Sequence, residues 1–134
     1  MFEILIILFL VLAFVLAVWV FFAQGRRKKI GQKELKYIHS HWNRVIQIHQ
    51  INPKEAIMDA DKLLDYTLKS RGYQGSLGEK LKKAGPLFSD ENGVWFAHKL
   101  RNRVAHELGD IRYAEVKSAL KSFKRALNDL GANL

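Results

Sequence analysis

The chain has 134 residues, no cysteine and a formal net charge of +9, with 22 Lys and Arg residues against 13 Asp and Glu residues. This length holds one compact domain besides a short anchor, which excludes a second soluble domain, and the lack of cysteine excludes disulfide bonds, thiol catalysis and thiolate zinc sites. The positive charge favours an anionic partner such as nucleic acid, an anionic membrane surface or a phosphorylated ligand.

The first element in the chain is an uninterrupted apolar segment. Residues 4–23 contain no charged residue and no proline. A helix of this length crosses a hydrocarbon core about 30 Å thick. Glu3 precedes the segment where a signal peptide has a basic leader, and Phe21 and Phe22 stand where a cleavage site needs small residues. We therefore predict a membrane anchor over residues 1–24.

Basic residues follow the apolar segment directly. Arg26, Arg27, Lys28 and Lys29 belong to a juxtamembrane linker, residues 25–31, whereas no Lys or Arg precedes the segment. The excess of basic residues on one side predicts a single-pass protein of the inner or plasma membrane, with its N-terminus outside and its C-terminal domain in the cytoplasm. The same side chains are expected to draw that domain toward an anionic leaflet.

The remaining residues, 32–134, have the pattern of an all-α domain. Apolar residues recur at three- and four-residue steps, which is the spacing of amphipathic helices. Capping residues, prolines and glycines divide the pattern. They predict a helix over residues 32–51, a second from Asn52-Pro53 to Gly72, a short third that opens with the capping box Ser76-Leu77-Gly78-Glu79 and ends near Gly85-Pro86, a fourth from Ser89-Asp90 to Leu108, and a last over about residues 113–130.

Each of the four long helices carries one apolar stripe. The linkers between the helices are short, so we expect an all-α fold in which the single N-terminal transmembrane helix is followed by an antiparallel four- to five-helix bundle. The predicted core positions are Leu35, Ile38, Trp42, Val45 and Ile46 in the first helix; Ala56, Ile57, Ala60, Leu63, Leu64, Thr67 and Leu68 in the second; Val94, Ala97, Leu100, Val104 and Leu108 in the fourth; and Val116, Ala119, Leu120, Phe123, Leu127 and Leu130 in the last.

A polar segment in the fourth helix is the best candidate for a functional site. At about 100° per residue, the apolar stripe faces the core and His98, Asn102 and His106 lie one above another on the opposite side, flanked by Arg101. The small side chain of Ala105 leaves room for a partner helix or a phosphate group to approach. This arrangement predicts a site, or half of one.

Arg101-Asn102, followed by three residues and His106, resembles the Arg-polar-x-x-x-His signature of the HEPN superfamily of small helical proteins. The place of the signature in the penultimate long helix and the sequence EAIMDADKLLDYTL in the second helix extend this resemblance over residues 30–134. Many members of that superfamily are metal-independent ribonucleases that act as dimers, with one composite active site between their signature helices. The resemblance therefore implies an HEPN-like bundle over residues 32–134 that binds or cleaves RNA as a homodimer, without a cofactor or metal.

The resemblance also implies a role for each signature residue. Arg101 would stabilise charge on the scissile phosphate, His106 would move the proton of the attacking 2′-hydroxyl or of the leaving oxygen, and Asn102 would orient it. Because some members serve as binding or toxin-neutralising partners, an antitoxin protein is a further expected partner. Basic residues nearby and on the last helix form a track for RNA phosphates, with a solvated surface as the alternative; they are His98, Arg103, Lys117, Lys121, Lys124 and Arg125.

Two other functions stay open. The run from Ala97 to Asn102 is similar to the Ala-His-x-Leu-Lys-Gly segment of histidine phosphotransfer domains, in which His98 would carry a phosphoryl group, although Asn102 stands where that family has a glycine. The domain could instead be a non-catalytic scaffold tethered to the membrane. Arg44 and His49 repeat the spacing of Arg101 and His106, but apolar residues surround them, and we interpret that pair as structural.

Overall fold

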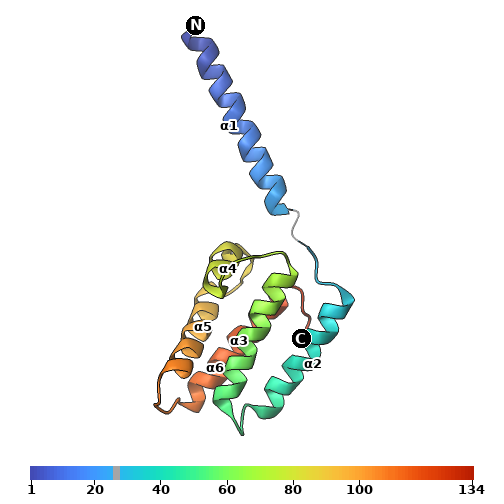
Figure 1. Cartoon of the computed structure of the whole chain (residues 1–134), viewed down its shortest axis with the longest axis vertical. Helices are drawn as coiled ribbons and strands as arrows, with labels where there is room; N and C mark the ends of the chain where they lie inside the picture. The colour runs from blue at the N-terminus through green and yellow to red at the C-terminus, as the bar shows by residue number, and fades with distance from the viewer. Residues whose placement is uncertain (26–27) are drawn as a thin grey trace.

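The computed structural model describes residues 1–25 and 28–134, and every regular element in these residues is helical (Figure 1). This confirms the predicted all-α fold, a bundle after an N-terminal helix. The α-helices are α1 Phe2–Gly25, α2 Gln32–Ile48, α3 Pro53–Ser70, α4 Leu77–Ala84, α5 Glu91–His106 and α6 Tyr113–Asp129, and a 3-10 turn, η1 Gly85–Leu87, follows α4.

Helix α1 projects from the bundle in Figure 1. Its stretch Phe2–Val20 is long and apolar enough to cross a membrane, and none of it is buried in the rest of the chain. An apolar helix without a protein partner leaves its side chains to another apolar environment, which is what a lipid bilayer provides. Of the predicted basic linker, Lys28 and Lys29 are exposed, whereas Arg26 and Arg27 lie outside the described residues.

The predicted caps begin the helices of the bundle. Asn52 accepts a hydrogen bond from the backbone N–H of Glu55 at 3.2 Å, and the Asp90 side chain caps α5 in the same way. At the start of α4, the Ser76 hydroxyl accepts from the Glu79 N–H at 3.3 Å while the Glu79 carboxylate accepts from the Ser76 N–H at 2.9 Å. Each such cap satisfies donors that the helix leaves unpaired and contributes about 1 kcal/mol.

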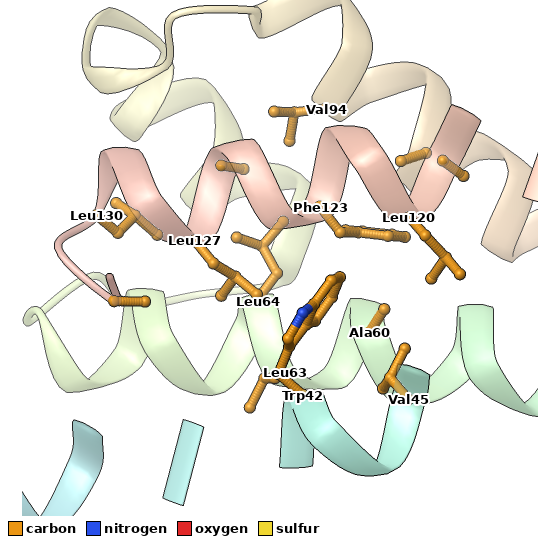
Figure 2. Packing of buried hydrophobic residues seen from close by; sticks show 14 of the residues in the cluster. Trp42, Val45, Ala60, Leu63, Leu64, Val94, Leu120, Phe123, Leu127 and Leu130 are labelled. Atoms are coloured by element: carbon orange, nitrogen blue, oxygen red, sulfur yellow. The ribbon is translucent and has the colours of Figure 1, made fainter. Parts of the chain in front are cut away.

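The core lies around α3, which packs against α2, α5 and α6. In Figure 1, α3 stands between α2 and α5, with α6 behind it. Figure 2 shows side chains from all four long helices of the bundle meeting in the core, with Trp42 of α2 and Phe123 of α6 at its centre. Every apolar position predicted for α3 and α6 is buried. Close packing of these stripes is the main source of stability, since burying one Leu, Ile or Phe side chain contributes about 1.5–3 kcal/mol.

Two of the predicted core positions are wrong. Leu108 is fully exposed, because α5 ends at His106 and the backbone of Glu107 turns to the extended conformation, with φ −106° and ψ 138°. Ile46 is 46% exposed, since it lies beyond the edge of the face that α2 presents to α3. Helix α2 also ends at Ile48 rather than at residue 51. The apolar pattern thus continues beyond the end of α5 at Leu108 and beyond the buried face of α2 at Ile46.

Candidate functional site

The functional candidates gather where α5 packs on α3. Helix α3 turns Ile57, Leu64 and Leu68 toward the interior, and Asp61 lies on the same face because it is four residues after Ile57 and three before Leu64. Its carboxylate is therefore buried between the helices. A buried carboxylate is costly unless cationic or donor groups surround it. Helix α5 supplies such groups.

One carboxylate holds two side chains of α5. The imidazole Nδ1 of His98 lies 2.8 Å from Asp61 Oδ1, and the guanidinium Nε of Arg101 lies 3.3 Å from Asp61 Oδ2. The His98 side chain is only 14% exposed and that of Arg101 is 27% exposed. Arg101 also donates from Nη1 to the Asn102 side-chain oxygen at 3.1 Å. The four residues thus form one connected polar cluster.

This cluster opens onto a cleft of about 570 Å³. Helices α3 and α5 form two of its walls and the start of α4 forms the third, and its lining residues are Asp61, Lys62, Asp65, Gly75, Ser76, Leu77, Gly78, His98 and Arg101. Gly75 has a φ of +104°, which a residue with a side chain rarely adopts, and this turn brings the N-terminus of α4 to the cleft.

The charges in the cleft are mostly paired. The buried ammonium of Lys80 lies 2.8 Å from Asp65, and Asp61 is held between His98 and Arg101. Lys62 is exposed at the same cleft. Each acidic residue of the lining therefore has a partner, and Lys62 and the exposed part of Arg101 are the positive groups left for a ligand. Among the described residues, no group of three or more His, Cys, Asp or Glu side chains is placed to hold a metal ion.

The structure separates His106 from this cluster. His106 is the last residue of α5 and is exposed, as is Ala105 before it. Five residues along a helix correspond to a rotation of about 140° and a rise of about 7.5 Å, so the side chains of Arg101 and His106 leave the helix in different directions. His98, Asn102 and His106 keep their four-residue spacing along α5, but the expectation that this face points away from the core is wrong at His98, which packs against Asp61 of α3.

The other predicted RNA contacts lie outside the cleft. Arg103 donates to the Glu115 carboxylate at 2.9 Å, and this hydrogen bond raises the pKa of Arg103 and lowers that of Glu115. Lys117, Lys121 and Lys124 are exposed along one face of α6, and Arg125, also exposed, lies 3.4 Å from Asp90. No residue of α6 lines the cleft, so this ridge is a separate basic surface.

The pair with the same spacing in α2 has structural partners. Arg44 forms an ion pair with Glu55 at 2.8 Å, and the imidazole of His49 lies 3.0 Å from the Tyr113 hydroxyl. Both contacts tie the ends of neighbouring helices together. Arg44 is well exposed and does not line the cleft, so it offers a matched comparison for Arg101.

Asp61 is the site residue that the sequence analysis missed. An acidic residue inside the apolar stripe of α3 was the available signal, because a charge at a core position requires a partner on a neighbouring helix. Lys80, which is buried at its contact with Asp65, carried a similar signal in α4.

Comparisons of the chain with protein-family models, with curated proteins and with solved structures find no match.

Proposed function

We propose that the chain is a membrane-anchored, HEPN-like RNA-binding protein that acts as a dimer and cleaves RNA without a metal ion. The observation that supports this most is the position of Arg101, which is hydrogen-bonded to Asn102 and partly exposed at a cleft whose acidic residues are paired. A guanidinium in such a place binds phosphate oxygens through its planar set of donors.

The proposed reaction is an internal transesterification. The 2′-oxygen of a ribose attacks the adjacent phosphorus, the bond from phosphorus to the 5′-oxygen breaks, and a 2′,3′-cyclic phosphate forms. One imidazole accepts the proton of the 2′-hydroxyl or supplies a proton to the leaving oxygen, and this is the role of His106. Arg101 stabilises the charge that develops on the phosphate, and Asn102 orients the reacting group.

A second copy completes the site in this proposal. Because Arg101 and His106 of one α5 point in different directions, Arg101 of one chain works with His106 of the other. The exposed Ala105 beside His106 leaves space for a facing helix. Anchoring both chains in one membrane raises their effective concentration and favours the dimer.

The anchor and its orientation are part of the same proposal. Helix α1 spans the inner or plasma membrane with its N-terminus outside, and the bundle lies in the cytoplasm where RNA is available. The apolar length of α1 supports a membrane-spanning helix. The exposed Lys28 and Lys29 that follow it support this orientation.

The test uses the full chain in lipid nanodiscs, incubated with mixed cellular RNA in the presence of a chelator. We expect the parent to leave cyclic phosphate ends, and Arg101→Ala and His106→Ala to lose cleavage. Arg44→Ala and His49→Ala are the controls, because they repeat the spacing on α2 and should cleave as the parent does.

Other outcomes select another function. RNA binding without cleavage by the folded parent would reduce the proposal to an RNA-binding module. If the folded parent neither binds nor cleaves RNA, the proposal is contradicted. A scaffold or a phosphotransfer domain then remains, and phosphorylation of His98 tests the phosphotransfer domain.

A further inference from the structure

We propose that the cleft between α3, α5 and the start of α4 is a phosphate-binding subsite within each chain, in which Asp61 positions His98 and Arg101 on the ligand. The inference rests on the proposed function for its ligand, the phosphodiester of an RNA strand. The same chemistry would accept the phosphate group of a free nucleotide, and the experiment below distinguishes the two sources.

The first step is the orientation of His98. Its Nδ1 is engaged by Asp61 at 2.8 Å, so the ring is fixed and Nε2 is the nitrogen left for a ligand. In the phosphate complex both ring nitrogens carry hydrogens, so that Nδ1 donates to Asp61 and Nε2 donates to a phosphate oxygen. A carboxylate that bonds one nitrogen of an imidazole fixes the orientation of the ring. His98 lines the cleft although little of its side chain is exposed. This is the arrangement of a histidine held ready for one ligand atom.

The second step concerns Arg101. Its Nε is buried near Asp61 without a hydrogen-bond partner, and its Nη1 donates to Asn102. A guanidinium has five donor hydrogens, so donors remain for a ligand at the exposed part of the side chain. Asp61 thus holds His98 and Arg101 at adjacent points on one wall of the cleft, and the two can contact oxygens of a single phosphate group.

The third step is the fit of the space. The cleft of about 570 Å³ lies within the range of about 300–1,000 Å³ that is usual for small-molecule sites. Lys62 adds an exposed positive charge, and Lys80 offsets Asp65. Leu77 and Gly78, the first residues of α4, also line the cleft, and the Glu79 carboxylate already occupies the backbone N–H of Ser76 at this helix terminus. Arginine, histidine and lysine are therefore the groups that select an anion.

The experiment measures the histidine side chains of the full chain in nanodiscs by NMR, while a short RNA, a nucleoside 3′-monophosphate or inorganic phosphate is added. The imidazole resonances of His98 should shift with RNA and, at higher concentration, with inorganic phosphate. His98→Gln and Arg101→Gln should each weaken RNA binding about tenfold or more. Asp61→Asn keeps the shape but removes the charge, and it should weaken binding and release the His98 ring.

Lys62→Gln keeps the test decisive if an Asp61 variant unfolds. Lys62 is exposed, so its loss should weaken RNA binding by a few-fold without loss of the fold, whereas Lys33→Gln, exposed on α2 and away from the cleft, should have no such effect.

Resonances of His98 that stay fixed at saturating RNA and phosphate would overturn the inference, and if RNA then shifts His106 alone, the proposed function survives without this subsite. If the monophosphate or inorganic phosphate shifts His98 but RNA neither binds nor is cleaved, the subsite is real and the proposed function fails. A stronger response to RNA than to the monophosphate supports both.

Discussion

Asp61 in α3 and His98 in α5 are 37 residues apart in the chain, and their side chains meet at 2.8 Å in the interior of the bundle. The same carboxylate faces Arg101 with its other oxygen. The contact therefore joins the central helix to the helix that carries the candidate site, and its loss should affect both the stability of the bundle and the binding of a ligand.

Replacing Asp61 with Ala should lower the free energy of unfolding by about 3 kcal/mol, because it leaves two cationic or donor groups of α5 partly buried without their acceptor. Denaturant unfolding of the bundle, followed by circular dichroism in micelles, measures the change. Asp59→Ala is the control on the same helix. Its ion pair with Arg44 is long, at 3.7 Å, and the Arg44 side chain is 58% exposed, so the loss should be under about 1 kcal/mol. Equal losses of unfolding free energy for Asp61→Ala and Asp59→Ala would mean that the buried cluster stabilises the bundle no more than the Asp59–Arg44 ion pair does.

A cavity in the hydrophobic core should also lower the free energy of unfolding. Phe123 is fully buried where α6 packs on α3, and Phe123→Ala should lower the free energy of unfolding by about 3–5 kcal/mol, since the loss of the ring removes apolar contacts and leaves a void. Ile46→Ala is the comparison, and because Ile46 is 46% exposed the loss should be under about 1 kcal/mol. Denaturant unfolding followed by circular dichroism measures both changes. A large loss of unfolding free energy for Ile46→Ala would indicate that a partner covers this side chain.

The sequence predicted those features of the fold that depend on residues close together in the chain, namely the helix caps and the apolar stripes. The caps at Asn52 and Ser76 act within one turn, and the stripes of α3 and α6 repeat at helical spacing, so both could be derived without knowing the neighbours of each helix. Leu108 was misplaced because the apolar spacing continues after the backbone has left the helix at Glu107, and periodicity alone does not locate that end.

The candidate site was predicted only on the side of α5. Arg101 and Asn102 were identified, and the structure places Arg101 in the lining of the cleft with Asn102 hydrogen-bonded to it. The contact of His98 with Asp61 depends on how α3 and α5 are placed side by side, which is a long-range property of the fold. The burial of Asp61 was visible in the pattern of α3, but its partner was not. The roles assigned to Arg101, Asn102 and His106 stay predictions.

The ion pair of Arg103 and Glu115 should make stability depend on pH. The hydrogen bond from Arg103 lowers the folded-state pKa of Glu115 below its ordinary value of 4.5, so the stabilisation is complete above pH 4.5 and is lost as the pH falls through the lowered pKa. Glu115→Gln should therefore reduce the melting temperature slightly at neutral pH and by less near about pH 3. Arg103→Gln removes the same interaction and should show the same trend. A difference between parent and variant that does not change with pH would contradict the prediction.

Helix α1 should determine where the protein is found. The full chain is expected to sediment with membranes and to resist alkaline carbonate, because Phe2–Val20 buries its apolar side chains in the bilayer. Two arginines placed at Leu10 and Leu12, in the middle of this stretch, should release the protein, since each charge at the bilayer centre costs about 2.5–3.5 kcal/mol. Two arginines at Lys28 and Lys29 change no charge and serve as the control. Release of the unaltered chain by carbonate would argue against a spanning helix.

The composite active site makes a prediction about mixed dimers. Arg101→Ala and His106→Ala should each be inactive when reconstituted alone. When the two variants share one nanodisc, about half of the dimers are mixed. The composite active site contains two pairs, each made of Arg101 from one chain and His106 from the other, and a mixed dimer keeps one of them intact. Cleavage should therefore return to about a quarter of the parent rate. A chain that carries both substitutions, mixed with either single variant, should stay inactive and is the control.

Inactive mixtures of folded, dimeric single variants would mean that Arg101 and His106 act within one chain or not at all. The direction in which each side chain leaves α5 argues against the first of these.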